Sequence, residues 1–243
     1  MSAVVIPARY ASSRFPGKAL AKIGGVPMIL HVAERCLRSK ADRVIVATDD
    51  ERILSVCESM EGLEVSMSDP SIPSGTDRAA AVTKYVDDDI VINVQGDEPF
   101  IDPELINALI DDLEANSAVN MNTACVLFAE GEDPGDPNSV KVVMDRDGFA
   151  LYFSRLPIPY DRDVIGVDRY RHIGIYGYRK DFLQKFASLE PALMESAEKL
   201  EQLRAMESGE RIRVIKTTYR PISVDTEEDL KKAEEYYKGL NNG

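Results

Sequence analysis

The sequence predicts an α/β fold built on a mostly parallel sheet. Three short runs rich in Val and Ile, at 3–6, 43–48 and 90–94, are nearly continuous in apolar residues. Strands of this kind are buried on both faces, as in parallel sheets that helices cover. Amphipathic helical patterns lie between the runs, and that alternation is typical of such a sheet. We therefore expect helices on both faces of one central sheet.

The first half of the chain supplies the elements of this sheet in order. Its helices carry apolar residues three and four positions apart, such as Met28, Ile29, Val32 and Cys36 in the first of them. Residues 3–6 form the first strand. The elements that follow it are helix 27–38, strand 43–48, helix 50–59, strand 63–67, helix 76–86, strand 90–94 and helix 103–115.

The pattern changes after residue 120. Strand-like segments at 121–128, 139–144 and 171–179 follow with little helix between them. The stretch 128–170 is rich in Pro, Gly and Asp, and we interpret it as a small antiparallel insertion that serves as a dimerisation subdomain. No linker divides the chain, so residues 1–243 are expected to form a single domain. The last predicted elements are helices 180–188 and 194–207, strand 211–218 and helix 226–238.

Composition limits the classes of function. The 243 residues include 29 Lys and Arg against 42 Asp and Glu, which gives a formal charge of −13. A nucleic-acid-binding protein would carry a basic surface, and attachment to an anionic membrane would also need one. The chain is therefore expected to bind neither. Small anionic substrates stay possible, because a few Arg and Lys residues or a bound metal ion can set the local field.

The sequence also favours a cytoplasmic protein. No apolar run approaches the length of a membrane-spanning helix, and the N-terminus has the pattern of a first strand. Three scattered cysteines, Cys36, Cys57 and Cys125, are typical of reduced thiols in a core. With only two histidines in the chain, a histidine-based zinc site is disfavoured.

A basic loop follows the first strand. It places Arg9, Arg14 and Lys18 close to Gly17 in an otherwise acidic protein. Ligands of open parallel sheets bind at the carboxyl ends of the strands, and clustered cations there suit a polyphosphate. A solvated basic loop is the alternative. Neither GxxxxGK[ST] nor GxGxxG occurs, which disfavours a P-loop or a dinucleotide site.

Two carboxylates lie where other elements meet this edge of the sheet. Asp97 follows the strand 90–94 in the segment QGDEP, and Asp225 precedes the last helix. Mg²⁺ takes one or two carboxylates together with substrate phosphate oxygens. The alternative for each Asp is a helix cap. Asp102 before Pro103 is the better cap of its helix, which leaves Asp97 available for a cation. For Asp225 the cap is the favoured interpretation, although Thr226 can cap the last helix instead and leave Asp225 as a second metal ligand.

Other polar groups have weaker signals. The segment Ser74–Arg78 begins a helix, where it could contact a base or an anion or simply cap the helix. Arg155 and His172 lie in strand-like surroundings, where a lone His is more often structural. On the predicted helix 194–207, Glu198, Glu201 and Gln202 share one face, which is either solvated or able to bind the hydroxyls of a polyol.

Taken in order, these segments resemble the 3-deoxy-manno-octulosonate cytidylyltransferases, or CMP-Kdo synthetases. The resemblance covers nearly the whole chain, and its most specific motifs are VQGDEP, ALYFSR, HIGIYGYR and LEQLR. The segments that carry it are IPARYASSRFPGK (6–18), VATDDERI (46–53), SGTDR (74–78), VQGDEPFI (94–101), VKVVMDRDGFALYFSR (140–155), RHIGIYGYR (171–179), LEQLR (200–204) and VDTEEDL (224–230).

The resemblance implies a Rossmann-like mixed sheet of the nucleotide-diphospho-sugar transferase type and an Mg²⁺-dependent reaction. CTP and 3-deoxy-D-manno-octulosonate (Kdo) would give CMP-Kdo, used for lipopolysaccharide synthesis, and pyrophosphate. It also implies a homodimer. The catalytic residues would be Lys18, Asp97 and Asp225, with both aspartates holding one or two Mg²⁺ ions. The CTP site would comprise Pro7, Ala8, Arg9, Arg14, Lys18, Ser74, Gly75, Thr76 and Arg78. The sugar site would comprise Gln95, Arg155, His172, Tyr176, Glu198, Glu201 and Gln202, with Arg155 facing the sugar carboxylate.

Three departures from the family pattern leave alternatives open. The chain reads GKAL where the family usually has GKPL, a looser segment precedes LEQLR, and no Gly precedes Val224-Asp225. The last two lie near the sugar side, so an 8-amino analogue of Kdo or another sugar acid is an alternative substrate. A non-catalytic nucleotide-binding module is a further alternative, although the intact Asp97 and Asp225 disfavour it. A nicotinamide dehydrogenase is disfavoured by the missing glycine motif.

Overall fold

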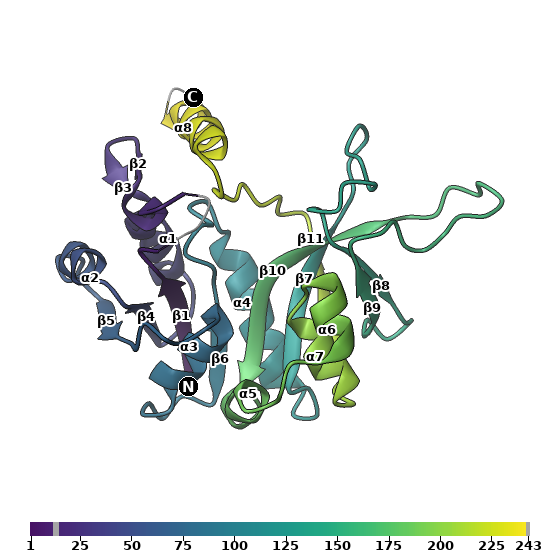
Figure 1. Cartoon of the computed structure of the whole chain (residues 1–243), viewed down its shortest axis with the longest axis horizontal. Coiled ribbons are helices and arrows are strands. Elements are labelled where there is room, and N and C mark those ends of the chain that lie inside the picture. The colour runs from purple at the N-terminus through teal and green to yellow at the C-terminus, as the bar shows by residue number, and fades with distance from the viewer. Residues whose placement is uncertain (12–14, 242–243) are drawn as a thin grey trace.

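The protein is described by a computed structural model that covers residues 1–11 and 15–241. Within these residues, nine strands form one sheet (Figure 1). The main path of the sheet runs in the order β11-β7-β10-β6-β1-β4-β5. The strands are β1 (Ser2–Ala8), β4 (Arg43–Thr48), β5 (Leu63–Met67), β6 (Ile90–Asn93), β7 (Met121–Leu127), β8 (Lys141–Met144), β9 (Ala150–Ser154), β10 (Tyr170–Arg179) and β11 (Ile212–Thr217).

The sheet is mixed but mostly parallel, as predicted. β1 pairs in parallel with β4 and β6, β4 with β5, and β7 with β11. Only β10 on the main path runs in the opposite direction, between β6 and β7. The carboxyl ends of the remaining strands on this path therefore lie on one edge, where ligands of such sheets bind.

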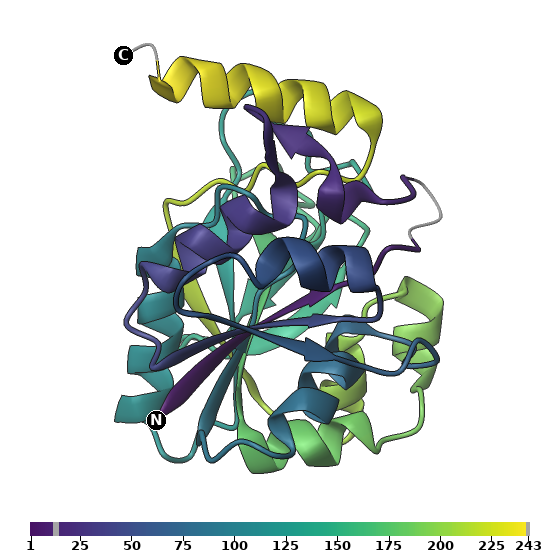
Figure 2. The ribbon, with the colours of Figure 1, turned by 90° about the vertical axis from the view of Figure 1, so that its left-hand side faces the viewer.

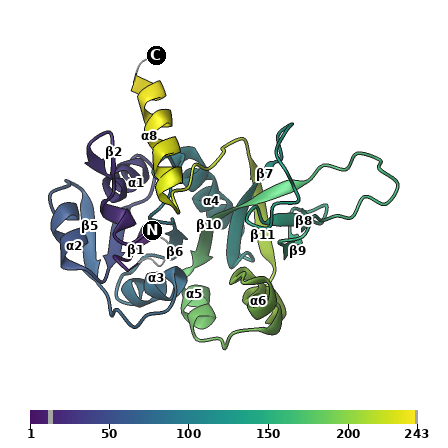
Figure 3. The ribbon, with the colours of Figure 1, turned by 45° about the horizontal axis from the view of Figure 1, so that its top comes forward.

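Helices cover both faces of the sheet (Figure 3). Alternate residues of β1 separate the two cores, because Val4 and Ile6 face one side and Val5 faces the other. The first core packs against α1 (Met28–Leu37), α2 (Glu51–Cys57) and α4 (Pro103–Ala115). The second packs against α3 (Gly75–Thr83), α5 (Lys180–Ala187) and α7 (Gln202–Glu207).

The C-terminal helix α8 (Glu227–Asn241) packs outside the two main layers. It lies across a small hairpin of β2 (Lys22–Ile23) and β3 (Val26–Pro27), as Figure 2 shows. A Cβ atom at Gly24 would lie 2.1 Å from the ring of Tyr237, so only glycine allows this approach. A third apolar cluster joins the hairpin, α8 and the loop after β6 through Ile23, Ala233 and Phe100, and it includes Val224 from the segment before α8.

The predicted helix 194–207 is wrong, because the chain breaks at Lys199. That residue has a φ of 54°, in the left-handed region, and ends α6 (Leu193–Glu198). The break turns the chain so that Leu200 and Leu203 enter the second core. Glu198 therefore lies on a different helix from Gln202, with Glu201 immediately before that second helix, and the three do not share one helical face.

The antiparallel insertion predicted in the stretch 128–170 is present, but strand β9 within it and the hairpin of β2 and β3 were not predicted. β9 pairs antiparallel with β8 across the Asp147-Gly148 turn, and β2 pairs with β3 across Gly24-Gly25. Both dipeptides favour tight hairpin turns because glycine adopts a positive φ at low energetic cost. β8 also pairs with β10, so this part of the stretch 128–170 extends the main sheet. Among the described residues, no helix is both long and apolar enough to cross a membrane.

Candidate active site

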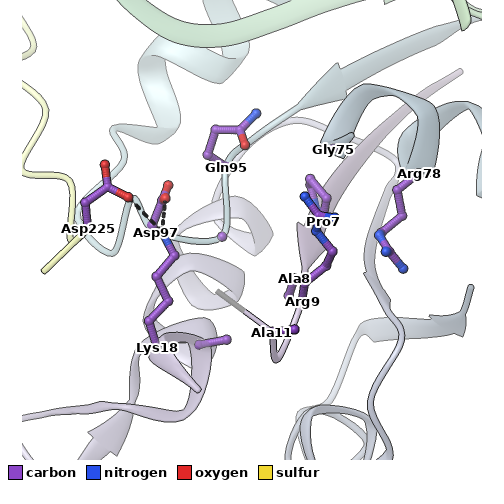
Figure 4. A pocket seen from close by; sticks show the side chains of 12 residues that line it. Pro7, Ala8, Arg9, Ala11, Lys18, Gly75, Arg78, Gln95, Asp97 and Asp225 are labelled. Atoms are coloured by element: carbon purple, nitrogen blue, oxygen red, sulfur yellow. Dashed lines mark hydrogen bonds and ion pairs between the residues drawn. The ribbon is translucent and has the colours of Figure 1, made fainter. Parts of the chain in front are cut away.

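A pocket of about 390 Å³ opens at the carboxyl ends of β1 and β6 (Figure 4). Its walls come from the loop after β1, the start of α3 and the loop after β6. Asp225, two residues before α8 begins, completes them. The sequence predicted a ligand site at this edge. The lining residues are Pro7, Ala8, Arg9, Ala11, Lys18, Ala19, Gly75, Arg78, Gln95, Gly96, Asp97 and Asp225.

Gly96 allows the loops after β1 and β6 to meet. A Cβ atom at this position would lie 2.8 Å from the backbone oxygen of Pro7, closer than side-chain carbons approach a carbonyl. The neighbouring Gln95 and Asp97 both line the pocket. The glycine in the QGDEP segment therefore has a packing role, and it brings two polar side chains up to the end of β1.

Lys18 lies between the two predicted metal ligands. Its Nζ donates to Asp97 Oδ2 at 2.6 Å and to Asp225 Oδ1 at 3.0 Å (Figure 4). Burial lowers the pKa of Lys18, but the two carboxylates outweigh that effect and hold the pKa above its usual value. The ammonium group is therefore charged at neutral pH. The cluster joins Lys18 to an aspartate 79 positions later in the sequence and to another 207 positions later.

The cap of α4 agrees with the sequence prediction. Asp102 caps α4 by accepting from the backbone N–H of Glu104 at 3.1 Å. At α8, Thr226 Oγ1 accepts from the N–H of Asp229, whose carboxylate accepts from the N–H of Thr226 at 3.1 Å. The Asp225 carboxylate accepts a hydrogen bond from Lys18 on the pocket side.

The two aspartates fit a divalent cation. They already hold one positive charge between them, that of the Lys18 ammonium. Carboxylate oxygens are the ligands that Mg²⁺ prefers, and Mg²⁺ completes its shell with water and substrate phosphate oxygens. Among residues 1–11 and 15–241, no cluster of three or more His, Cys, Asp or Glu side chains forms a metal site. Any cation held here would thus depend on the substrate for further ligands.

The start of α3 is tightly held by side-chain hydrogen bonds. Ser74 caps the helix and accepts from the N–H of Asp77 at 3.0 Å. Thr76 is buried and donates to Glu201 Oε2 at 2.5 Å. Gly75 is the residue of this turn that lines the pocket. The helix start therefore presents backbone to the pocket, while the hydroxyl groups of Ser74 and Thr76 bind other residues of the protein.

Arg78 borders the pocket but is fully buried. Its guanidinium donates to Asp49 Oδ2 at 3.0 Å and to Ser68 Oγ. Burial lowers the pKa of Arg78, and the positive charge of Arg9 lowers it further, while Asp49 opposes both. Asp49 also accepts from the N–H of Tyr10 at 3.4 Å, so the pair ties α3 to the basic loop. Arg14 lies outside the described residues.

Four predicted sugar-site residues lie near α3 or the central strands. Gln95 lines the pocket, and Tyr176 is the register partner of Asn93 on β6. Burial raises the pKa of Glu201, which accepts the hydrogen bond from Thr76. Gln202 is also buried. Within the described part of the chain, the side-chain nitrogen of Gln202 and the side-chain oxygen of Asn93 have no hydrogen-bond partner.

Of the seven predicted sugar-site residues, only Gln95 is among those that line the pocket in Figure 4. Arg155 and Glu198 instead bind each other and neighbouring residues. The Arg155 guanidinium donates to the carbonyls of Glu198 at 2.6 Å, Pro137 at 2.8 Å and Lys199 at 3.3 Å. The Glu198 carboxylate accepts from Ser154 Oγ and the Arg155 N–H, both at 2.9 Å. These two residues join β9 to α6.

His172 is a residue of β10, and its side chain faces Thr123 of β7 and Phe153 of β9. Its Nε2 lies 3.0 Å from Thr123 Oγ1, and its ring makes an edge contact with Phe153 at a centroid distance of 5.0 Å. Burial lowers the pKa of His172 to about 3, so the ring is neutral at pH 7. Tyr176 lies beside it, with ring centroids 5.4 Å apart.

Glu98 is a site residue that the sequence did not single out. It follows Asp97 directly and accepts hydrogen bonds from Ser223 Oγ and, at 3.3 Å, from Tyr219 Oη. Burial raises the pKa of Glu98 to about 7, and Ser223 opposes that shift. Its place in the QGDEP segment beside Asp97 was the only signal in the sequence.

Comparison with known proteins agrees with this geometry. A family model described as cytidylyltransferase matches residues 3–212. The chain is 50% identical to the 3-deoxy-manno-octulosonate cytidylyltransferase of Syntrophotalea carbinolica, over 97% of this chain and 98% of that protein. It is 49% identical to the protein of the same name from Aeromonas hydrophila, over 94% of this chain and 96% of that one.

Solved structures show the same relationship. A structure of CMP:2-keto-3-deoxy-manno-octonic acid synthetase complexed with CTP superposes with a TM-score of 0.94 at 41% identity, covering 98% of this chain and 99% of that one. A putative glucose-1-phosphate thymidylyltransferase from Bacillus anthracis shares the fold alone, with a TM-score of 0.72 at 15% identity over 98% of this chain and 96% of that one.

Proposed function

The chain belongs to the 3-deoxy-manno-octulosonate cytidylyltransferase family, and from that premise we propose that it transfers CMP from CTP to the anomeric hydroxyl of Kdo. The products are CMP-Kdo, which supplies Kdo for lipopolysaccharide synthesis, and pyrophosphate. One observation carries the proposal: half of the residues are identical to those of a named relative over nearly the whole chain. The meeting of Lys18, Asp97 and Asp225 in one pocket supports it. We expect the reaction in the cytoplasm, where CTP is available.

The reaction forms one bond and breaks another at phosphorus. The anomeric oxygen bonds to the α-phosphorus of CTP, and the bond from that phosphorus to the bridging oxygen of the leaving pyrophosphate breaks. Such a transfer needs positioning and charge neutralisation more than covalent chemistry by the protein. We assign the neutralisation by side chains to Arg9, Arg14 and Lys18. Arg9 and Lys18 both line the pocket, which supports their assignment.

We assign the rest of the CTP site to the ends of β1 and α3. Pro7, Ala8 and Gly75 line the pocket from these two stretches of backbone with small apolar side chains or none, which leaves room for close contact with a flat base. Ser74, Thr76 and Arg78 hold this backbone in place through their bonds to Asp77, Glu201 and Asp49. Asp97 and Asp225 would hold Mg²⁺, which when bound supplies positive charge to the phosphates of CTP.

For the sugar we propose a site beside the pocket, between Gln95 and Glu201. Unpartnered polar atoms on Gln202 and Asn93 support this location, since buried polar groups normally have a partner and a hydroxylated ligand would supply one. Tyr176 lies next to Asn93 in the sheet. Contact of Arg155, His172 and Glu198 with the sugar stays a prediction, because their polar groups bind other parts of the protein.

Pyrophosphate release tests the function. The assay contains CTP and Mg²⁺, with Kdo and its 8-amino analogue supplied separately. Release with Kdo supports the proposal, and a strong preference for the amino sugar would keep the mechanism and change the substrate. Release with neither sugar, while CTP still binds, would contradict it. Omitting Mg²⁺ and adding a chelator should abolish release if Asp97 and Asp225 hold the metal.

We also propose a homodimer that forms through the stretch 128–170. The β8–β9 hairpin and the connection to β10 extend away from the body (Figure 1). The connection and the hairpin expose large apolar side chains, and a soluble monomer rarely gathers so many on one segment. Light scattering should give twice the monomer mass, and a monomer at micromolar concentration would contradict the proposal. The exposed side chains are Leu151, Leu156, Tyr160, Val164 and Ile165.

A further inference from the structure

The segment that carries Asp225 has to cross the sheet. It begins after β11, and Asp97 follows β6, with β7 and β10 between these two strands. Three strand spacings correspond to roughly 14 Å. Residues 218–226 make this crossing without forming a helix or a strand (Figures 1 and 3). The position of Asp225 therefore depends on tertiary contacts that hold an irregular segment.

Those contacts converge on the loop that carries Asp97. The backbone N–H of Val224 donates to the carbonyl oxygen of Asp97 at 2.9 Å. Val224 itself is fully buried against Phe100. The two aspartates thus belong to segments that lie side by side, and a short stretch after β6 supplies both an aspartate and the contacts that hold the other one.

Glu98 makes two further contacts with the crossing segment. One carboxylate oxygen accepts from Ser223 Oγ, and the other accepts from Tyr219 Oη at 3.3 Å. A single side chain thus holds two points of the segment, the nearer of them two residues before Asp225. Both donors are hydroxyl groups, so each loses its acceptor if Glu98 is removed.

We propose that Glu98 is a positioning residue, which holds Asp225 beside Asp97 through Ser223 and Tyr219 so that both carboxylates bind one cation. This inference rests on the proposed function, in which the two aspartates hold Mg²⁺. Partners that orient metal-binding side chains typically change metal affinity by 10–100-fold when they are removed. Glu98 acts through the backbone between Ser223 and Asp225, so we expect an effect near the lower limit of that range.

Mn²⁺ binding tests the proposal without relying on turnover. Mn²⁺ is titrated into the protein in the presence of CTP, and binding is followed by water-proton relaxation. We expect Glu98→Ala to weaken Mn²⁺ binding about 10-fold. Glu98→Gln keeps an oxygen acceptor and should recover part of that loss. Ser223→Ala and Tyr219→Phe each remove one contact and should have smaller effects of the same sign. The matched control is Glu104→Gln, at an exposed position on α4, which should bind Mn²⁺ as the wild type does.

A double-mutant cycle separates positioning from direct ligation. If Glu98 acts through Asp225, Glu98→Ala causes no further loss of Mn²⁺ binding in the Asp225→Asn background. An undiminished loss in that background would overturn the inference, because Glu98 would then act independently of Asp225. Normal binding by Glu98→Ala and Ser223→Ala, with binding lost in Asp97→Asn and Asp225→Asn, would also overturn it while leaving the metal site intact. If the aspartate variants themselves bind Mn²⁺ normally, the metal assignment in the proposed function is wrong.

Discussion

Charged side chains are used differently in two regions of this molecule. In the pocket at the ends of β1 and β6, Lys18, Asp97 and Asp225 bind one another across segments distant in sequence. At the junction of β9 and α6, the Arg155 guanidinium binds three backbone carbonyls, and Glu198 binds a hydroxyl and a backbone N–H. The first group surrounds a space that a ligand can enter. The second joins secondary-structure elements.

The comparison shows that residue type is a weak guide to role. Both regions contain Arg or Lys beside Asp or Glu, and a resemblance between sequences assigns both to substrate. Position in the fold distinguishes them, because the pocket lies where the parallel strands end and the junction lies beyond an antiparallel hairpin. The following predictions test this distinction in order of expected effect.

The largest effect should come from Asp97. We expect Asp97→Asn to lower turnover by at least about 100-fold, on the scale of losing a strong electrostatic contact to the transition state. Pyrophosphate release at saturating Mg²⁺ measures it. The matched control is Asp102→Asn, since Asn also caps helices well and Asp102 lies outside the pocket. Near-normal turnover by Asp97→Asn would show that this carboxylate does not hold the metal.

The next prediction concerns pH and His172. Burial lowers its pKa to about 3, against about 6.5 in the unfolded chain, so the unfolded state binds the proton more tightly. The contribution of this group to stability is complete above pH 6.5 and falls as pH drops toward 3. Between pH 7 and pH 5, the loss should be about 2 kcal/mol in the free energy of unfolding.

Urea denaturation of the wild type and His172→Gln at several pH values, at one protein concentration, checks this. The variant cannot take up the proton, so its stability should fall less between pH 7 and pH 5. A constant difference between the two proteins across that range would show that His172 is not buried in a neutral state. It would also indicate that solvent reaches the His172 ring more than the structure shows.

The smallest effect should come from Arg155. Arg155→Ala should raise the KM for Kdo about 10-fold with little change in the KM for CTP, because the junction of β9 and α6 loosens beside the proposed sugar site. Leaving carbonyls without a donor should also lower the free energy of unfolding by about 1 kcal/mol. The control is Arg146→Ala, at an exposed position near the hairpin turn. A raised KM for CTP with an unchanged KM for Kdo would show that Arg155 affects CTP binding, which contradicts the prediction.

Much of the fold follows from local patterns in the sequence. Continuous apolar runs predicted β1, β4 and β6, and the helical spacing of apolar residues predicted α1 and α4. The caps at Asp102 and Thr226 also follow from adjacent residues. Strand ends predicted the position of the pocket, since parallel strands end on one edge. These features depend on backbone preferences and burial over a few neighbouring residues.

Other features depend on contacts between distant residues. β10 enters the sheet between β6 and β7 in the opposite direction, and no local pattern specifies that pairing. The break at Lys199 places Leu200 and Leu203 in the core, although the local spacing favoured one continuous helix. The hydrogen bond from Ser223 to Glu98 likewise joins residues 125 positions apart.

The sequence by itself thus determined the class of fold, most of the elements and caps, and the residues at the strand ends. Only the tertiary structure decided that Lys18 lies between Asp97 and Asp225, and that Arg155 donates to backbone carbonyls. The physical reason is that a helix or a strand is stabilised largely by interactions within a short stretch of chain. A side chain's hydrogen-bond partner is determined by the packing of the whole molecule, which brings distant segments within about 3 Å.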